Sequence, residues 1–347
     1  TGASPDRQTM FWGFGSSQAA PFHCSFTATV KARVLKSLVP VTGASGGNAS
    51  TGANGSGPIR IDTSSDGRYT VFQSIATNLD ASHPTSVPQI YRYDAQTGTI
   101  AMVSLTSTGA TPSTCAALGS GSPTISDDGN FVAFLSTCRL VPTDTNTFAD
   151  VYVRDMSAAG TTYLASVDNG GNWHGATAVT PAIAGSGTAV AFSMTAGTIS
   201  AGGSTTNVDQ FGVSCAGVRA WLFDLGTQTS SRIDYPGLGD PTCPLTSTGG
   251  AASTTNPFPD ASGARVVYAT TAANLGDGDT DNTIDIHLWD NSGGLEQVSL
   301  VSVNAGGTKL NANSATPVIS SDGTTVAFDS LASNVGSPTM SGTHEIY

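Results

Sequence analysis

The stretch SDDGNFVAFLS, from Ser126 to Ser136, contains a tight turn followed by an almost wholly apolar strand. Glycine adopts positive φ without steric cost, so Asp128-Gly129 suits the turn of a β-hairpin. An apolar run of this kind is expected where both faces of a strand are covered by neighbouring elements. The stretch therefore predicts a hairpin whose second strand is buried inside the protein.

The same unit occurs five times along the chain. The other copies are SSDGRYTVFQS (64–74), AGSGTAVAFSM (184–194), DASGARVVYAT (260–270) and SSDGTTVAFDS (320–330). The turn glycines Gly67, Gly129, Gly187, Gly263 and Gly323 are 62, 58, 76 and 60 residues apart. In the second repeat, DVYVRD (150–155) predicts a third strand and TTYLASV (161–167) an outer strand. A period of this length suits a four-stranded blade with generous loops.

These repeats resemble the TolB-type, WD40-like propeller repeat known as PD40. The pattern S-x-DG-x-x-VAF-x-S, then D-x-N-x-x-x-D-(V/I)-(Y/H)-V-x-D, is complete in the second repeat and clear in the fourth and fifth. The first repeat lacks the acidic loop, and the third contains a long insertion; the resemblance covers residues 59–347. It implies a β-propeller in an extracytoplasmic setting. It implies no activity, because propellers serve as enzymes, binding modules and scaffolds alike.

We therefore expect an all-β fold: a single β-propeller of four-stranded blades, with five blades expected and six as the alternative. The repeats span residues 58–120, 121–178, 179–254, 255–314 and 315–347. The last repeat ends at its third strand, so residues 26–43 are predicted to complete that blade and close the ring, giving a propeller over 26–347. Closure removes open strand edges. Residues 1–25 form an N-terminal extension to which the sequence assigns no structure.

The charge composition narrows the classes of partner. The chain has 13 basic and 25 acidic residues, a net charge of -12. A field of this sign repels phosphate backbones and anionic lipid, which argues against nucleic-acid binding. No apolar run approaches the roughly 18 residues that a membrane span needs. Because only 11% of residues are charged, solubility rests on Ser, Thr, Asn and Gly, as on many extracellular surfaces. We expect a secreted, periplasmic or cell-surface protein.

The five cysteines include no CxxC pair and therefore favour disulfides in an oxidising compartment. In a four-stranded blade, the linkers between blades and the loops from second to third strands open on one face. On this reasoning we predict the bridges Cys115–Cys138 and Cys215–Cys243, with Cys24 left over. The alternative is a set of buried free thiols.

The loop GDGDTDNTID (276–285) is the sharpest local feature. Its aspartates and one backbone carbonyl occupy relative positions 1, 3, 5, 7 and 9 of a calcium-loop pattern: Asp277, Asp279, Asp281, Thr283 and Asp285. We predict a structural Ca²⁺ here, with a solvated acidic loop as the alternative. The related loop of the second repeat has a shorter set at positions 3, 5 and 9, namely Asp144, Asn146 and Asp150, and is a weaker candidate.

Three residues in loops are candidates for ligand contact: His83, Trp173 and His174. Trp173 lies in NGGNWHGAT between blades, where an exposed indole could stack on a sugar. The alternative for each is an ordinary loop residue. Neither GxSxG nor HExxH occurs, so no catalytic residue is assigned.

Two functional hypotheses follow. The first is an extracellular, non-catalytic binding or structural module that contacts a protein or carbohydrate, or that self-assembles through its N-terminal segment in a surface assembly. The alternative is a secreted enzyme acting on a polysaccharide or other polymer at the propeller mouth. Two or more titratable groups at one end of the channel would favour the enzyme. Without a catalytic motif, we favour the first hypothesis.

Overall fold

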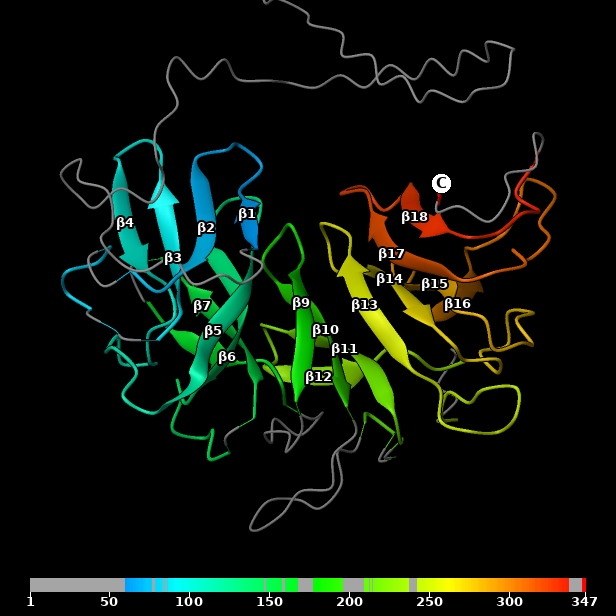
Figure 1. Ribbon diagram of the computed structural model, residues 1–347, viewed down its shortest axis with the longest axis horizontal. Coiled ribbons are helices and arrows are strands. Elements are labelled where there is room, and N and C mark those ends of the chain that lie inside the picture. The colour runs from blue at the N-terminus through cyan, green and yellow to red at the C-terminus, as the bar shows by residue number, and fades with distance from the viewer. Residues whose placement is uncertain are drawn as a thin grey trace, which may run out of the picture. The chain divides into compact units, whose positions relative to one another are not determined.

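The computed structural model describes residues 60–347 apart from 77–78, 84, 86, 147, 158–159, 168–176, 196–208, 212, 214, 237–241 and 337–344. Within these residues the chain forms strands, turns and loops, and no helix. The strands lie in five antiparallel sheets, each built from strands that are consecutive in the sequence (Figure 1). The all-β propeller fold with four-stranded blades is thereby confirmed.

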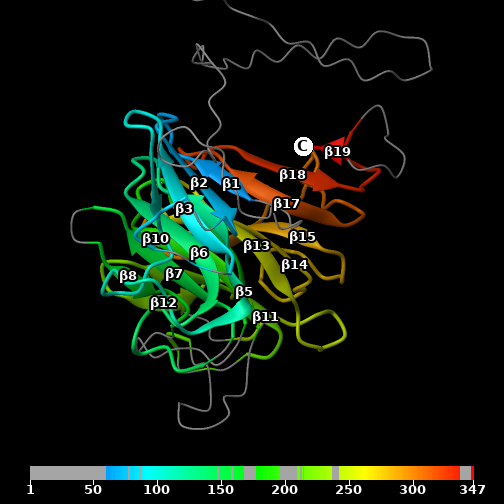
Figure 2. The same cartoon turned by 60° about the vertical axis from the view of Figure 1, so that its left-hand side comes forward.

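The five blades follow the five sequence repeats. The first contains β1 (Ile61–Thr63), β2 (Tyr69–Ser74), β3 (Gln89–Asp94) and β4 (Thr99–Met102). The second contains β5 (Cys115–Ile125), β6 (Phe131–Cys138), β7 (Asp150–Asp155) and β8 (Thr162–Leu164). The third contains β9 (Ala178–Ile183), β10 (Ala189–Thr195), β11 (Val218–Asp224) and β12 (Thr229–Arg232). The fourth contains β13 (Thr254–Pro259), β14 (Arg265–Thr270), β15 (Asp285–Asp290) and β16 (Gln297–Leu300). The fifth contains β17 (Ser314–Ile319), β18 (Val326–Ser330) and β19 (Glu345–Ile346), side by side in Figure 2.

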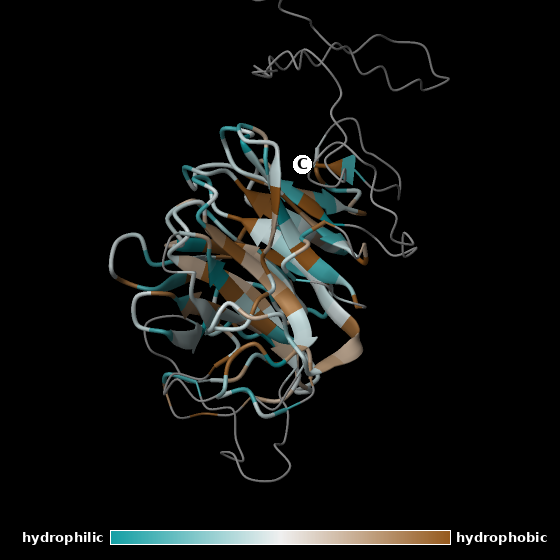
Figure 3. Ribbon diagram, turned by 90° about the vertical axis from the view of Figure 1, so that its left-hand side faces the viewer, coloured by the Kyte–Doolittle hydropathy of each residue, from teal (hydrophilic) through white to brown (hydrophobic). Residues whose placement is uncertain are grey.

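The apolar second strands form the core between adjacent blades. Phe134 of β6 and Phe192 of β10 are fully buried in one cluster that joins the first three blades. Val266 and Tyr268 of β14 belong to a second cluster with residues of the third blade. Figure 3 shows the consequence, with brown apolar segments along the strands and teal polar residues at the turns. The core therefore lies between sheets, as expected for strands covered on both faces.

The hairpin turns of successive blades are joined by backbone hydrogen bonds. The contacts are Ser65 N to Asp127 O, Asp127 N to Gly185 O, Ser186 N to Ala261 O and Ala261 N to Ser321 O, at 2.7–3.1 Å. Gly129 has φ of 75°, and a Cβ there would lie 2.1 Å from the ring of Tyr69 in the preceding blade. Glycine is thus required both for the turn and for the close approach of the blades.

The ring has an open end in the described part of the chain. A Cβ at Gly67 of the first blade would meet nothing within 4 Å, whereas the four later turn glycines all approach the blade before them. The fifth sheet has three strands. Residues 26–43, predicted to complete it, and the extension 1–25 lie outside the described residues, so this closure and the choice between five and six blades stay predictions.

Both predicted disulfides are present. Cys115 and Cys138 are directly opposite each other in β5 and β6, with their Cα atoms 3.9 Å apart. Cys215, before β11, is bonded to Cys243, beyond β12, with a Cα separation of 5.4 Å. The first bridge differs from expectation in one respect, because its cysteines lie within paired strands and not in loops. Cys24 lies outside the described residues.

Candidate functional site

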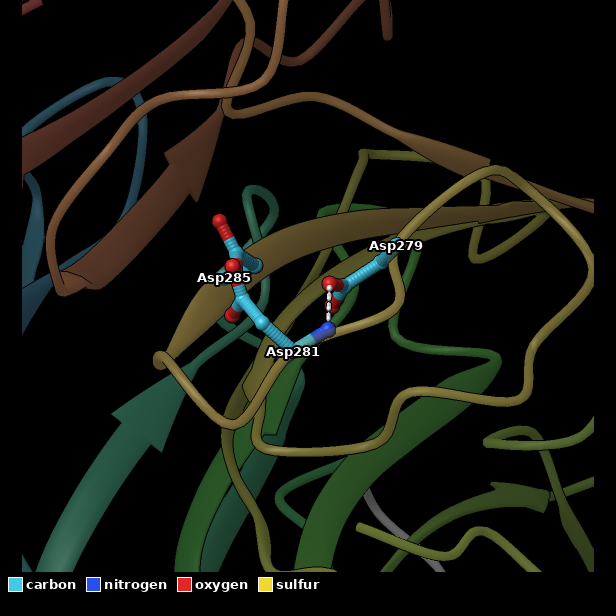
Figure 4. A group of neighbouring side chains, drawn as sticks. All are labelled: Asp279, Asp281 and Asp285. Carbon is cyan, nitrogen blue, oxygen red and sulfur yellow. Dashed lines mark hydrogen bonds between the residues drawn. The ribbon is translucent and has the colours of Figure 1, made fainter. Parts of the chain in front are cut away.

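The acidic loop between β14 and β15 gathers three of its aspartates. Asp279, Asp281 and Asp285 each bring one carboxylate oxygen within 4.8 Å of the others (Figure 4). Local turns aim them, since Asp279 Oδ1 accepts from the amide of Asp281 at 3.2 Å, and Asp281 Oδ1 accepts from that of Thr283 at 2.7 Å. Asp279 and Asp285 are buried, and Asp281 is exposed. This three-carboxylate group can hold a metal ion.

A lysine that the sequence pattern did not single out reaches into this group. Lys309, in the linker between β16 and β17, places Nζ 2.8 Å from Asp285 Oδ2 and 3.0 Å from Asp281 Oδ2. Its distance to Asp279 Oδ1 is 3.7 Å. The ammonium also donates to the Thr283 hydroxyl at 2.7 Å. The one available sequence signal was that Lys309 is the only lysine after Lys36.

The fourth aspartate of the pattern, Asp277, is paired elsewhere. Its Oδ2 lies 2.9 Å from Nε2 of His287 on β15, and the His287 side chain is fully buried. His287 also stacks on Tyr268 with ring centroids 6.0 Å apart. Burial raises the pKa of Asp277, but the bond and charge of His287 outweigh it and lower the pKa overall. Asp277 therefore belongs to a buried acid–imidazole pair beside the three-carboxylate group.

The related loop of the second blade is arranged differently. Asp150 Oδ1 accepts from the Ser166 hydroxyl at 2.6 Å, and Asp144 Oδ2 accepts from the Tyr152 hydroxyl at 2.5 Å. Burial raises the pKa of both carboxyls, that of Asp150 to about 8. The side chain of Asn146 bonds to Asp150. A cation site at Asp144, Asn146 and Asp150 stays a prediction.

Of the loop residues predicted to contact ligand, the structure describes His83. Its Nδ1 lies 2.9 Å from Asp80 Oδ2, which also accepts from the amide of Met102 at 3.1 Å. His83 is thereby tied to the outer edge of its own blade, which suits a loop-anchoring role. Trp173 and His174 lie outside the described residues.

The third blade contains a buried network of four charged residues that the sequence analysis missed: Asp209, Arg219, Arg232 and Asp234. Asp209 is 3% exposed, and the other three are 2% or less. Asp234 Oδ2 is 3.3 Å from Arg219 Nη1, and Arg232 Nε is 2.8 Å from Asp209 Oδ2. The sequence around Arg219 and Arg232 matches no metal-binding or catalytic motif. Their pairing with the two aspartates is therefore visible only in the folded structure. Three residues of the network, Arg219, Arg232 and Asp234, lie within the segment that the Cys215–Cys243 disulfide closes.

Titratable groups also gather where the hairpin turns meet. Asp127, Asp128, Asp260, Asp322 and Arg265 line an open hollow of about 640 Å³ there. Hydrogen bonds from Ser320 and Thr324 lower the pKa of Asp322 to about 2. Burial raises the pKa of Asp128, but bonds from Ser126 and Asn130 lower it overall. These two carboxylates are held ionised by their own turns, a state that suits turn formation better than proton transfer at neutral pH.

No protein-family model matches the sequence, and no match is found among functionally curated proteins. Solved structures with a similar arrangement include TolB from Acinetobacter baumannii, at 16% identity and a TM-score of 0.41, over 80% of this chain and 52% of that one. An oligogalacturonate lyase from Vibrio parahaemolyticus matches at 13% identity and 0.43, over 85% and 64%. The β-propeller domain of the Trilobed protease from Pyrococcus furiosus matches at 8% and 0.44, over 84% and 67%.

The chain thus spans about half the length of the Acinetobacter TolB. Among the described residues, no helix combines the length and apolar character that crossing a membrane would require.

Proposed function

We propose that this chain is an extracytoplasmic, non-catalytic propeller module that binds one structural Ca²⁺ in the acidic loop of its fourth blade. The observation that carries the proposal is the convergence of Asp279, Asp281 and Asp285 at the position where the alternating carboxylates predicted a cation. Hard oxygen ligands on a short loop are the donor set that Ca²⁺ prefers.

One carboxylate oxygen of this group has no hydrogen-bond partner and could bind a cation. Asp279 is 2% exposed, and its Oδ2 is buried with no hydrogen-bond partner among the described residues. An ionised oxygen in this position is costly unless a positive charge lies beside it. Burial raises the pKa of Asp279 and the charge of Asp285 adds to the rise, which the charge of Lys309 only partly offsets. A divalent cation bound at these oxygens would offset the remaining rise.

The extracytoplasmic assignment is supported by the two disulfides, which persist in oxidising compartments. The non-catalytic assignment rests on the lack of a catalytic motif in the sequence. Titratable groups do gather in the hollow between the hairpin turns, but two of them, Asp128 and Asp322, are engaged as hairpin acceptors with lowered pKa. A protein or carbohydrate partner, and self-assembly through the N-terminal segment, remain part of this proposal as the ways in which the module would act.

The calcium proposal is tested by thermal unfolding of the full chain in EDTA and in excess CaCl₂. Ligand that binds only the folded state stabilises it by about 2.7 kcal/mol at one hundred times Kd, so Tm should rise with Ca²⁺ concentration. Asp279→Asn keeps the size of the side chain and removes its charge, and it should abolish the rise.

Asp127→Asn is the matched control, because it removes one carboxylate from the turn face and leaves the acidic loop intact. Its Ca²⁺-dependent rise should equal that of the parent. Identical melting curves in EDTA and Ca²⁺ for the parent chain, or a full rise retained by Asp279→Asn, would show that the loop is acidic but does not bind calcium.

A further inference from the structure

The cation-binding oxygens of the fourth blade already face a positive charge supplied by the chain itself. Nζ of Lys309 contacts Asp281 and Asp285 and lies 3.7 Å from Asp279. Its neighbours are thus the same three carboxylates that would bind a metal. The lysine comes from the linker that enters the fifth blade, and an isolated bridge pairs it with Val303.

An ammonium group and a calcium ion cannot occupy this group together. Lys309 Nζ lies 2.8 Å from Asp285 Oδ2 and 3.0 Å from Asp281 Oδ2. These two oxygens would have to bind Ca²⁺ directly. A Ca²⁺ at 2.3–2.6 Å from the same atoms would lie within a few ångström of Nζ, where like charges repel strongly. The lysine can leave, because its side chain is 18% exposed and its flexible stem can carry the ammonium into water.

One ammonium does not neutralise the group. Three carboxylates and one lysine leave a net of two negative charges. Oδ2 of Asp279 is buried and has no hydrogen-bond partner among the described residues. A divalent ion neutralises more of this charge than the lysine does. Asp285 would keep its second tie to the linker, because its Oδ1 accepts from the Ser302 hydroxyl at 2.7 Å.

We infer that Lys309 is the resident cation of the acidic loop, and that Ca²⁺ binds only by displacing it. Lys309 thereby sets the calcium affinity and couples binding to release of its own ammonium from the acidic loop. The inference rests on the proposed function, since it concerns the same loop, but the two fail under different results.

The affinity test uses the full chain, freed of metal with EDTA and titrated with CaCl₂ at fixed ionic strength by calorimetry. Lys309→Met keeps most of the stem and removes the charge, and it should bind Ca²⁺ at least tenfold more tightly than the parent. Arg60→Met, which removes an exposed positive charge at the start of the first blade, should bind as the parent does. Lys309→Gln serves as a second charge-neutral variant if the methionine variant does not fold.

The outcomes separate the two claims. If the parent binds Ca²⁺ and Lys309→Met binds no more tightly, the displacement inference is wrong and the calcium site stands. If only the charge-neutral variant binds, Lys309 blocks the loop, and both calcium binding by the parent and its displacement of Lys309 are wrong. If neither binds, both are wrong.

A second measurement follows Lys309 directly in the parent protein. Acetic anhydride labels accessible amines, and peptide mapping resolves Lys309 because no other lysine follows Lys36. Displacement should make Lys309 label faster when Ca²⁺ is added. Unchanged or slower labelling under conditions where calorimetry shows Ca²⁺ bound overturns the inference.

Discussion

The buried charge network of the third blade gives a sharp test of how this fold is stabilised. Asp234 is fully buried and faces two arginines, with Oδ2 3.3 Å from Arg219 Nη1 and Oδ1 3.7 Å from Arg232 Nη1. Burial raises the pKa of Asp234, and the two arginine charges oppose that rise. The two arginines are therefore the charges that favour the ionised form of this carboxyl, although its pKa stays raised overall.

Asp234→Asn keeps the shape of the side chain and removes its charge. Arg219 would then lose its carboxylate partner, and Arg232 would keep its pair with Asp209. Breaking a buried pair by removing one partner costs about 3–5 kcal/mol. The lower end is expected here, because Arg219 also donates to the carbonyl of Ala216 at 2.6 and 2.9 Å and stays partly satisfied.

Urea unfolding, followed by tryptophan fluorescence, measures the effect. With an m-value of about 3 kcal/mol/M for a chain of this size, a loss of about 3 kcal/mol moves the midpoint down by about 1 M. Asp290→Asn is the control, since it breaks the half-exposed pair with Arg265, whose Nε lies 2.8 Å from Asp290 Oδ2. Exposed pairs contribute little, so its midpoint should scarcely move. A midpoint for Asp234→Asn equal to that of the control would refute this reasoning.

Two further outcomes are expected. Replacing both cysteines of either disulfide by serine should lower the free energy of unfolding by about 3 kcal/mol in the chain-entropy treatment, measured by urea unfolding of the oxidised parent and the variant; equal midpoints would contradict it. Asp150 binds its proton more tightly in the folded state, where burial raises its pKa to about 8, than in the unfolded state. The free energy of unfolding should therefore fall as pH rises from about 4 to 8. Asp150→Asn should flatten this slope, and an unchanged slope would count against the assignment.

Much of the fold could be predicted from the sequence because it is encoded locally. An Asp-Gly or Ser-Gly turn followed by an apolar strand specifies a hairpin wherever it occurs, and the five copies correspond to the five sheets of the described residues. Blade geometry also placed each pair of cysteines on a common face, and both bridges are present. These features depend on residues within one repeat or at its borders, where chain connectivity limits the alternatives.

The chemistry of the acidic loop could not be settled in the same way, because it depends on side chains that only folding brings together. Alternating aspartates predicted the convergence of carboxylates, but Asp277 faces a histidine on the adjoining strand. Lys309 follows Asp285 by more than a full strand and linker, and its 2.8 Å contact exists only because the linker folds back over the loop. In the third blade, likewise, Asp209 and Arg232 pair across a whole strand hairpin. Sequence spacing determines which residues share a turn or strand, whereas the burial of charge against charge is decided by tertiary packing.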